Sequence, residues 1–245
     1  MNTASYRVQR LPASCARGSC LAVYLVAVAA FTAVLPGARA FTTTVNNINA
    51  PIPDGDLNGY QNSVTVSGLS GPVAHTSVML DILGGFNGDY YAYLYHNGVS
   101  AILLNRVGLS GSNPAGYSDP GFGPNASANP FTLDDLAAVD VHRYQTLGAS
   151  VNGAGQVTGL WQPDGRAIDP TSPGSVFDTA ARSKLLGIFN GMDPNGVWTL
   201  YVVDASAGFQ GTLVSWGLTV VPEPGVGSLG LLAFGMALCR LRKQR

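Results

Sequence analysis

Histidine, serine and aspartate are the residue types of this chain that could support acid–base or nucleophilic chemistry. Each of three histidines, His75, His96 and His142, could act as a general base beside a serine and an aspartate. The segments that hold such groups in known enzymes are missing: no Gly-x-Ser-x-Gly elbow, His-Glu-x-x-His pair or Walker loop occurs. We therefore expect no catalytic residue in this chain and assign each histidine a structural or surface role.

A short acidic segment, Asp54-Gly55-Asp56-Leu57-Asn58-Gly59, matches the first six positions of a calcium-binding loop. Alternating oxygen ligands before a glycine turn suit a hard cation. The twelfth position, however, is Thr65 where a bidentate glutamate is expected, and Pro51 and Pro53 leave no helix in front of the loop. A simple turn is the favoured interpretation. We predict no cofactor and no metal ligand, with calcium as a weak alternative.

Tyrosines in the segment Asp89–His96 suggest a binding surface. If this segment is a strand, every second side chain faces outward, which gives a stripe of Tyr91, Tyr93 and Tyr95. A tyrosine ring pairs an apolar face with a polar tip, so an exposed stripe could stack on sugar rings or on a protein partner. The alternatives are that tyrosine simply suits strands or that a loop covers the stripe.

The elements that would position these side chains are short strands joined by turns. Alternation and turn residues predict strands at Val64–Leu69, Ser77–Leu83, Asp89–Tyr95 and Ala101–Leu104, with an Asn97-Gly98 hairpin between the last two. Residues 108–130 read as a long loop, and residues 131–140 and 156–161 give weaker strand signals. Asp178–Phe189 fits one short helix with Asp178 as its N-cap.

The strongest strand signals are Val197–Asp204 and Gly211–Val220. Side chains expected to face the core are Trp198, Leu200 and Val202 in the first and Val214, Trp216, Leu218 and Val220 in the second. We expect two neighbouring antiparallel strands at the centre of an all-β sandwich, with Trp198 and Trp216 buried on facing or adjacent strands and Asp204 at a strand end.

Charge separates the central domain from its two ends. Between residues 41 and 221, five Lys and Arg stand against 13 Asp and no Glu, a net charge of −8 with neutral histidine. Such a domain is a poor nucleic-acid binder because that affinity rests on Lys and Arg contacts to phosphate. All three cysteines lie outside it, so we expect no disulfide there.

Both ends of the chain have the pattern of sorting signals. The N-terminal 40 residues combine arginines, an apolar run and Ala38-Arg39-Ala40, the small-x-small cleavage site of a signal peptide. At the other end a motif, Val221, Pro222, Glu223 and Pro224, precedes an apolar segment, residues 225–239. The basic stop that follows contains Arg240, Arg242, Lys243 and Arg245. Four cations after a short apolar span predict a cytoplasmic tail.

This C-terminal layout resembles the PEP-CTERM signal of Gram-negative bacteria, whose motif Val221–Pro224 matches residue by residue. The resemblance implies export, transient anchoring in the inner membrane through the hydrophobic segment, and processing by an exosortase. It also implies a final location at the cell surface or in the extracellular matrix, in bacteria that make extracellular polysaccharide.

The central domain resembles the P domain, or P/Homo B domain, of proprotein convertases. The resemblance rests on Pro194–Asp204 and Gly211–Leu218, and on earlier pieces such as Val64–Leu69 and Phe131–Asp135. It implies a jelly-roll β-sandwich. Asp81–Phe86 departs from the family pattern and resembles a small insertion before the following strand.

The expected organisation is a signal peptide at 1–40, a P-domain-like sandwich at 41–220 and a sorting signal at 221–245. We expect a non-catalytic binding or structural protein of the cell surface or matrix, with extracellular polysaccharide as a candidate partner. The alternative is an accessory domain acting with a secreted subtilisin-like serine protease, because in convertases the P domain stabilises a separate catalytic domain.

The paired signals predict a mature protein that lacks both ends. Intact mass measurement of the exported protein should place its start near Phe41 and show the loss of residues after the Val221–Pro224 motif. Glu223→Ala should leave the precursor in the membrane. Recovery of a full-length chain carrying Arg245 from the cell surface would contradict the prediction.

Overall fold

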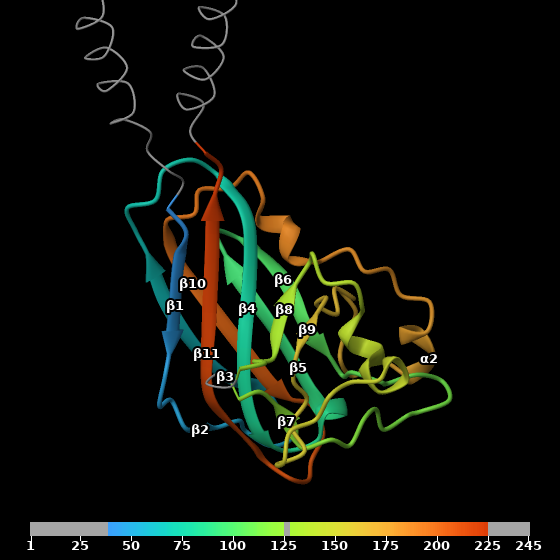
Figure 1. Ribbon diagram of the computed structural model, residues 1–245. Helices are drawn as coiled ribbons and strands as arrows, with labels where there is room; N and C mark the ends of the chain where they lie inside the picture. Colours follow the sequence, from blue (N-terminus) through green and yellow to red (C-terminus); the bar gives the residue numbers. More distant parts are fainter. Residues whose placement is uncertain (1–38, 125–127, 225–245) are drawn as a thin grey trace, which may run out of the picture.

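The computed structural model describes residues 39–124 and 128–224, and these form two β-sheets packed face to face (Figure 1). The first sheet has the order β1 (Phe41–Val45), β11 (Gly211–Pro222), β4 (Val73–Gly84), β8 (Thr132–Asp134) and β9 (Leu160–Trp161), with β2 (Ala50–Pro51) beside β11 and β7 (Gly121–Phe122) beside β4. The second has the order β3 (Asp56–Val66), β10 (Gly196–Asp204), β5 (Tyr90–His96) and β6 (Val99–Asn105).

The strand pairing is that of a jelly roll. Among the eight main strands, the first pairs with the last (β1 with β11), the second with the seventh (β3 with β10), the third with the sixth (β4 with β8) and the fourth with the fifth (β5 with β6). A folded double ribbon produces this order in a two-sheet jelly roll. The all-β sandwich expected from the sequence, and the jelly-roll form implied by the resemblance, are confirmed.

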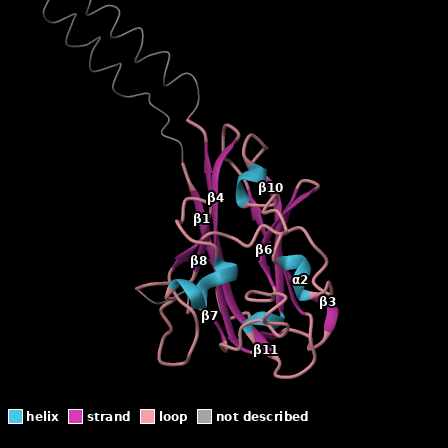
Figure 2. Cartoon of the chain, turned by 90° about the vertical axis from the view of Figure 1, so that its right-hand side faces the viewer, coloured by secondary structure: helices cyan, strands magenta, loops and turns pink. Residues whose placement is uncertain are grey.

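Helical turns and loops gather on the side of the sandwich that faces the viewer in Figure 2, around β6 and β8. They include α2 (Gly174–Phe177) and three 3-10 turns: η1 (Asn87–Asp89), η2 (Val141–Leu147) and η3 (Leu186–Phe189). No helix of the described ranges is long and apolar enough to cross a membrane.

The core lies between the inner faces of the two sheets and centres on Trp198 and Trp216, both fully buried. Each indole nitrogen has a partner: Trp198 Nε1 donates to the carbonyl of Pro194 at 2.9 Å, and Trp216 Nε1 donates to Asn62 Oδ1 at 2.8 Å. Because buried indole N–H groups are satisfied in this way, the large rings add apolar contact without an unpaired donor.

Two details of the expected core are wrong. β10 and β11 are not neighbours, because the turn between them crosses from one sheet to the other, so Trp198 and Trp216 lie in facing sheets. A register shift between Leu213 and Ser215 also interrupts the alternation of β11. Leu213 is therefore fully buried, while Val214, expected in the core, is only half-buried.

The expected helix at Asp178–Phe189 is also wrong. Asp178 follows the short helix α2 as its C-cap, and its carboxylate accepts a hydrogen bond from the Gly111 backbone N–H. The following residues stay extended because they bond to a neighbouring segment: Arg182 forms a β-bridge with Arg166, and the Lys184 N–H donates to the Gly165 carbonyl at 3.0 Å. Only Leu186–Phe189 turns helically.

The segment Asp81–Phe86, expected to be an insertion, belongs mostly to β4. Residues 81–84 pair with β11, and the chain turns at Gly84 and Gly85, both with positive φ. A side chain on Gly85 would collide with the Tyr90 hydroxyl, so this turn requires glycine.

We predict that Trp216→Ala lowers the free energy of unfolding by about 3–5 kcal/mol, because it removes a fully buried indole and orphans Asn62 Oδ1. Chemical denaturation of the purified protein measures this loss. Leu136→Ala is the control, since that side chain is 81% exposed and its truncation should cost little. Equal stability of the two variants would refute the assigned core.

Candidate ligand-binding groove

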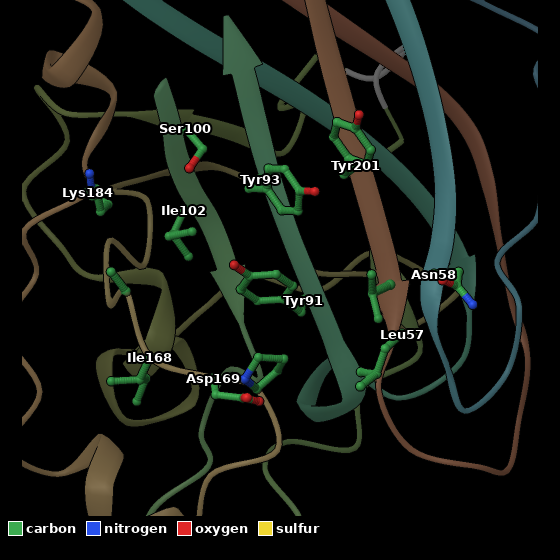
Figure 3. Close-up of a pocket in the computed structure, with 13 residues that line it drawn as sticks. Leu57, Asn58, Tyr91, Tyr93, Ser100, Ile102, Ile168, Asp169, Lys184 and Tyr201 are labelled. Atoms are coloured by element: carbon green, nitrogen blue, oxygen red, sulfur yellow. The ribbon is translucent and has the colours of Figure 1, made fainter. Parts of the chain in front are cut away.

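An open groove of about 560 Å³ lies on the outer face of the four-stranded sheet (Figure 3). Its floor is built from side chains that alternate with core residues on three strands: Tyr91 and Tyr93 on β5, Ile102 on β6, and Tyr201 and Val203 on β10. One wall is the loop 167–170 together with Lys184, and Leu57 from the start of β3 borders the opposite side. A volume of this size is within the range of small-molecule sites.

Two tyrosines form the flat centre of the floor. Tyr93 and Tyr201 occupy paired positions on β5 and β10, and their rings stack with centroids 4.6 Å apart and planes 11° apart. Tyr91 continues the surface along β5, with its ring centroid 5.7 Å from that of Tyr93. The sequence pattern did not point to Tyr201, because its place depends on the register between two strands far apart in the chain.

The predicted tyrosine stripe faces outward but divides into two parts. Tyr91 and Tyr93 are half-buried and line the groove, whereas Tyr95 is 42% exposed and lies outside the groove lining. Burial, with smaller effects of Tyr93 and of the carboxylates of Asp169 and Asp164, raises the pKa of Tyr91 to about 12. Tyr91 therefore stays a neutral hydrogen-bonding phenol at physiological pH. A ligand role for the stripe stays a prediction.

Two side chains of opposite charge lie at separate places in the groove (Figure 3). Lys184 lies near Ser100 and Ile102, whereas Asp169 lies below Tyr91. The Asp169 carboxylate is exposed and accepts hydrogen bonds from the hydroxyl and backbone N–H of Thr171, which lower its pKa. Asp169 is thus ionised at neutral pH, and the side chains of Asp169 and Lys184 can bind polar substituents around an aromatic floor.

The wall of the groove is fixed to the end of β6. Asn105 Nδ2 donates to the carbonyls of Arg166 and Ile168 at 2.9 and 3.0 Å, and Arg106 reaches the carbonyl of Pro170 at 3.4 Å. Backbone bonds continue this attachment, since the Ile102 N–H donates to the Lys184 carbonyl at 2.8 Å. The groove is therefore preformed by the fold.

A buried polar network supports the same wall from behind. Asp164, fully buried, contacts His142 Nδ1 at 2.6 Å and Arg166 at 3.1 Å, and Arg166 also pairs with Asp140 at 2.9 Å. His142 Nε2 lies 3.0 Å from the carbonyl of Leu109. Buried charges need such partners, so this network holds the loop rather than presenting groups to a ligand.

The other histidines are also engaged by the fold. His75 Nε2 lies 3.0 Å from Asp134 Oδ2, across β4 and β8. His96 is buried, stacks on Trp198 with centroids 3.8 Å apart, and has its two ring nitrogens 3.0 and 2.8 Å from the carbonyls of Val197 and Asp193. None of the three histidines lines the groove.

The segment weighed as a calcium loop divides between a turn, at Asp54 and Gly55, and the first four residues of β3. Asp56 accepts hydrogen bonds from the backbone and side chain of Asn58, and Asp54 accepts from the Gly208 N–H at 2.9 Å. Across residues 39–124 and 128–224, no three His, Cys, Asp or Glu side chains gather as ligands of one metal ion would.

The sorting-signal residues lie largely outside the described ranges: Ala38 and the basic stop Arg240, Arg242, Lys243 and Arg245. Ala40 is exposed immediately before β1. Val221 and Pro222 form the end of β11, two residues beyond the expected domain boundary, and the Glu223 N–H donates to the Pro72 carbonyl at 2.7 Å. The motif thus begins within the sheet.

Comparisons with known proteins identify no family: neither a family model nor a curated protein sequence matches the chain. Among solved structures, the chain is similar to a crystal structure of a serine protease of Aeromonas sobria, with 16% identity and a TM-score of 0.41. It is similar also to a crystal structure of the complex of an Aeromonas sobria serine protease with a chaperone, with 17% identity and a TM-score of 0.39. Each match covers 81% of this chain and only 29% of the other.

Asp204, which follows the groove residue Val203 in sequence, has a burial that the sequence analysis did not predict. Asp204 ends β10, as expected, but it is fully buried; its Oδ2 has no hydrogen-bond partner, and Oδ1 accepts from the Ser206 N–H at 3.4 Å. Burial, with a smaller effect of the nearby carboxylates of Asp89 and Asp54, raises the pKa of Asp204 to about 7. Arg106 offsets only part of this effect.

A raised pKa in the folded state predicts that stability falls as pH rises. Folded Asp204 keeps its proton up to about pH 7, whereas the unfolded side chain loses it near pH 4. Between these two values this group lowers the free energy of unfolding by about 1.4 kcal/mol for each pH unit. Asp204→Asn, which keeps the Ser206 acceptor, should flatten the pH dependence of unfolding free energy. The exposed Asp169→Asn is the control; an unchanged slope in Asp204→Asn would contradict the assignment.

Proposed function

We propose that this chain is an exported, non-catalytic binding protein whose tyrosine-floored groove takes a saccharide chain at the cell surface or in the extracellular matrix. The observation that carries the proposal is the stacked pair Tyr93 and Tyr201, extended by Tyr91, on the floor of a preformed groove. Flat aromatic faces fit the apolar faces of sugar rings, and neighbouring polar groups fit their hydroxyls.

The polar groups around the rings support a saccharide over a purely apolar ligand. Ser100, Asn58, Asp169 and Lys184 border the floor, and the phenol hydroxyl of Tyr91 can both donate and accept a hydrogen bond. The net charge of −8 in residues 41–221 disfavours nucleic acid as the ligand.

The non-catalytic part of the proposal rests on the chemistry of the lining. Its titratable groups are the tyrosines, Lys184 and Asp169, and no histidine lines the groove. Asp169 accepts hydrogen bonds from both the hydroxyl and the backbone N–H of Thr171, two residues later, which is the pattern of a local turn. The groups with acid–base potential, His142 and Asp164, contact each other in the buried network.

Export and sorting remain part of this proposal through the resemblance of the C-terminal segment to the PEP-CTERM signal. An exosortase at the inner membrane would process the chain near Val221–Pro224. Since Val221 and Pro222 pair with β4, cleavage after the motif would leave the sandwich intact, whereas cleavage before it would remove the end of β11.

The second candidate is an accessory domain of a secreted subtilisin-like serine protease. The residues that resemble the P domain motivate it, and the jelly-roll strand order agrees with the fold that this resemblance implies. Co-purification of the exported protein with a secreted protease, and a loss of that protease's thermal stability without it, would favour the accessory role over saccharide binding.

The test removes the aromatic floor. Tyr93→Ala with Tyr201→Ala should weaken binding to the cell's own matrix polysaccharide by tenfold or more, because each lost aromatic contact costs on the order of 1 kcal/mol. Affinity electrophoresis or calorimetry with the purified exported protein measures the change. Tyr95→Ala is the matched control, since it removes a tyrosine from the same strand and face but outside the groove.

Thermal unfolding of each variant separates loss of binding from loss of fold. Equal weakening by Tyr95→Ala, or undiminished binding by a folded double variant, would rule out the groove as the saccharide site. Hydrolysis of peptide, ester or glycoside substrates that a single Ser or His substitution abolishes would overturn the non-catalytic assignment.

A further inference from the structure

The two edge strands of the four-stranded sheet, β6 and β3, differ in whether a further segment covers them. At β6, the segment 164–184 adds backbone hydrogen bonds, among them Gly165 N–H to the Ile102 carbonyl at 3.0 Å. At the other edge, β3 pairs only with β10, and no further backbone partner of β3 exists within residues 39–124 and 128–224. An edge strand of 11 residues thus presents free N–H and C=O groups.

Natural edge strands are protected against pairing by charges, proline or bulges. In β3 such features are confined to its beginning, where Asp56 is charged, Gly59 has a positive φ and the ladder with β10 is irregular near Val202. The rest of the strand, Tyr60–Val66, contains no Lys, Arg, Asp, Glu, Gly or Pro. This half of the edge is regular and unprotected.

The neighbouring edge strand of the other sheet, β1, is also uncovered and uncharged. β1 pairs only with β11, and Figure 1 shows β1 and β3 on the side of the sandwich away from the helices. No Lys, Arg, Asp or Glu occurs in residues 40–53 or 57–80. In a domain of net charge −8, a second acidic domain meets little repulsion along these stretches, which are interrupted only at Asp54 and Asp56.

Apolar side chains along this side are incompletely buried. Six residues pack against the core and stay only partly buried: Phe41, Val45, Ile48, Tyr60, Val64 and Leu69. They come from β1, β3 and the segments next to them, so the sandwich is open between its two free edges. A partner along β3 would cover part of this surface as well as pair the strand.

We propose that two copies of this chain associate through β3, which pairs antiparallel with β3 of the second copy. An antiparallel pair of identical strands is related by a two-fold axis, so one self-complementary edge closes a dimer with no free end of the same kind. The pairing joins two four-stranded sheets into one continuous sheet of eight strands.

The arrangement has a consequence for the groove described above. The two-fold axis of an antiparallel pair runs perpendicular to the sheet, so the outer faces of both copies point the same way. If the proposed function holds, both tyrosine floors then face one matrix, and the second attachment becomes intramolecular. The dimer itself does not depend on saccharide binding.

The experiment measures the mass of the purified exported protein in solution by sedimentation velocity over a wide concentration range. The expected result is a concentration-dependent dimer. Gln61→Lys with Thr65→Lys places charges on two exposed positions of β3 and should weaken dimerisation about tenfold or more. The control, Leu136→Lys with Ser183→Lys, adds the same charge at exposed loop positions and should leave the dimer unchanged.

Cysteine scanning distinguishes this edge from any other contact. Gln61→Cys, Ser63→Cys and Thr65→Cys, tested singly and in mixtures of two single variants, place thiols along the strand, and only the position or pair of positions related by the two-fold axis should crosslink. A monomer at all concentrations, or a dimer that resists the β3 lysine pair, would overturn the proposal. Saccharide binding by a monomer would leave the proposed function standing and refute the dimer alone.

Discussion

The burial of one face of β10 is the constraint on which the sandwich and the groove both depend. Trp198, Leu200 and Val202 point inward and are fully buried, and Trp216 of the facing sheet closes the same core. Strand alternation then leaves Tyr201 and Val203 on the outer face, beside Tyr91 and Tyr93 of β5. A one-residue slip of β10 would exchange core and groove residues, so the packing that stabilises the domain also fixes its binding surface.

The wall of the groove follows from a second requirement, the satisfaction of buried polar groups. β6 would be a free edge without the segment 164–184, and the bonds that cover it also place Lys184 and the loop 167–170 beside the tyrosines. Asp164 and Arg166 become buried in the process and need His142 and Asp140 as partners. The wall and the ion network therefore both follow from the attachment of the segment 164–184 to β6.

Local pattern was enough to predict the sandwich, most of its strands, the Trp198 and Trp216 core and the outward tyrosines of β5. It failed where the outcome depended on contacts distant in sequence. Asp178 was the expected N-cap of a helix over Asp178–Phe189, yet the bond from Lys184 to Gly165 holds part of the segment extended. Tyr201 joins the site only through the register of β10 against β5, and Asp204 is buried because separate segments close over it.

The contrast between the two edges of the groove-bearing sheet links stability to assembly. Covering β6 required about twenty residues of loop and a buried ion network, whereas β3 carries neither a cover nor protecting charges over Tyr60–Val66. In an acidic domain, charges could have been placed there at no cost to the core, because Gln61, Ser63 and Thr65 are exposed. An uncharged edge beside half-buried apolar residues is therefore better explained by a surface that pairs than by one that stays in water.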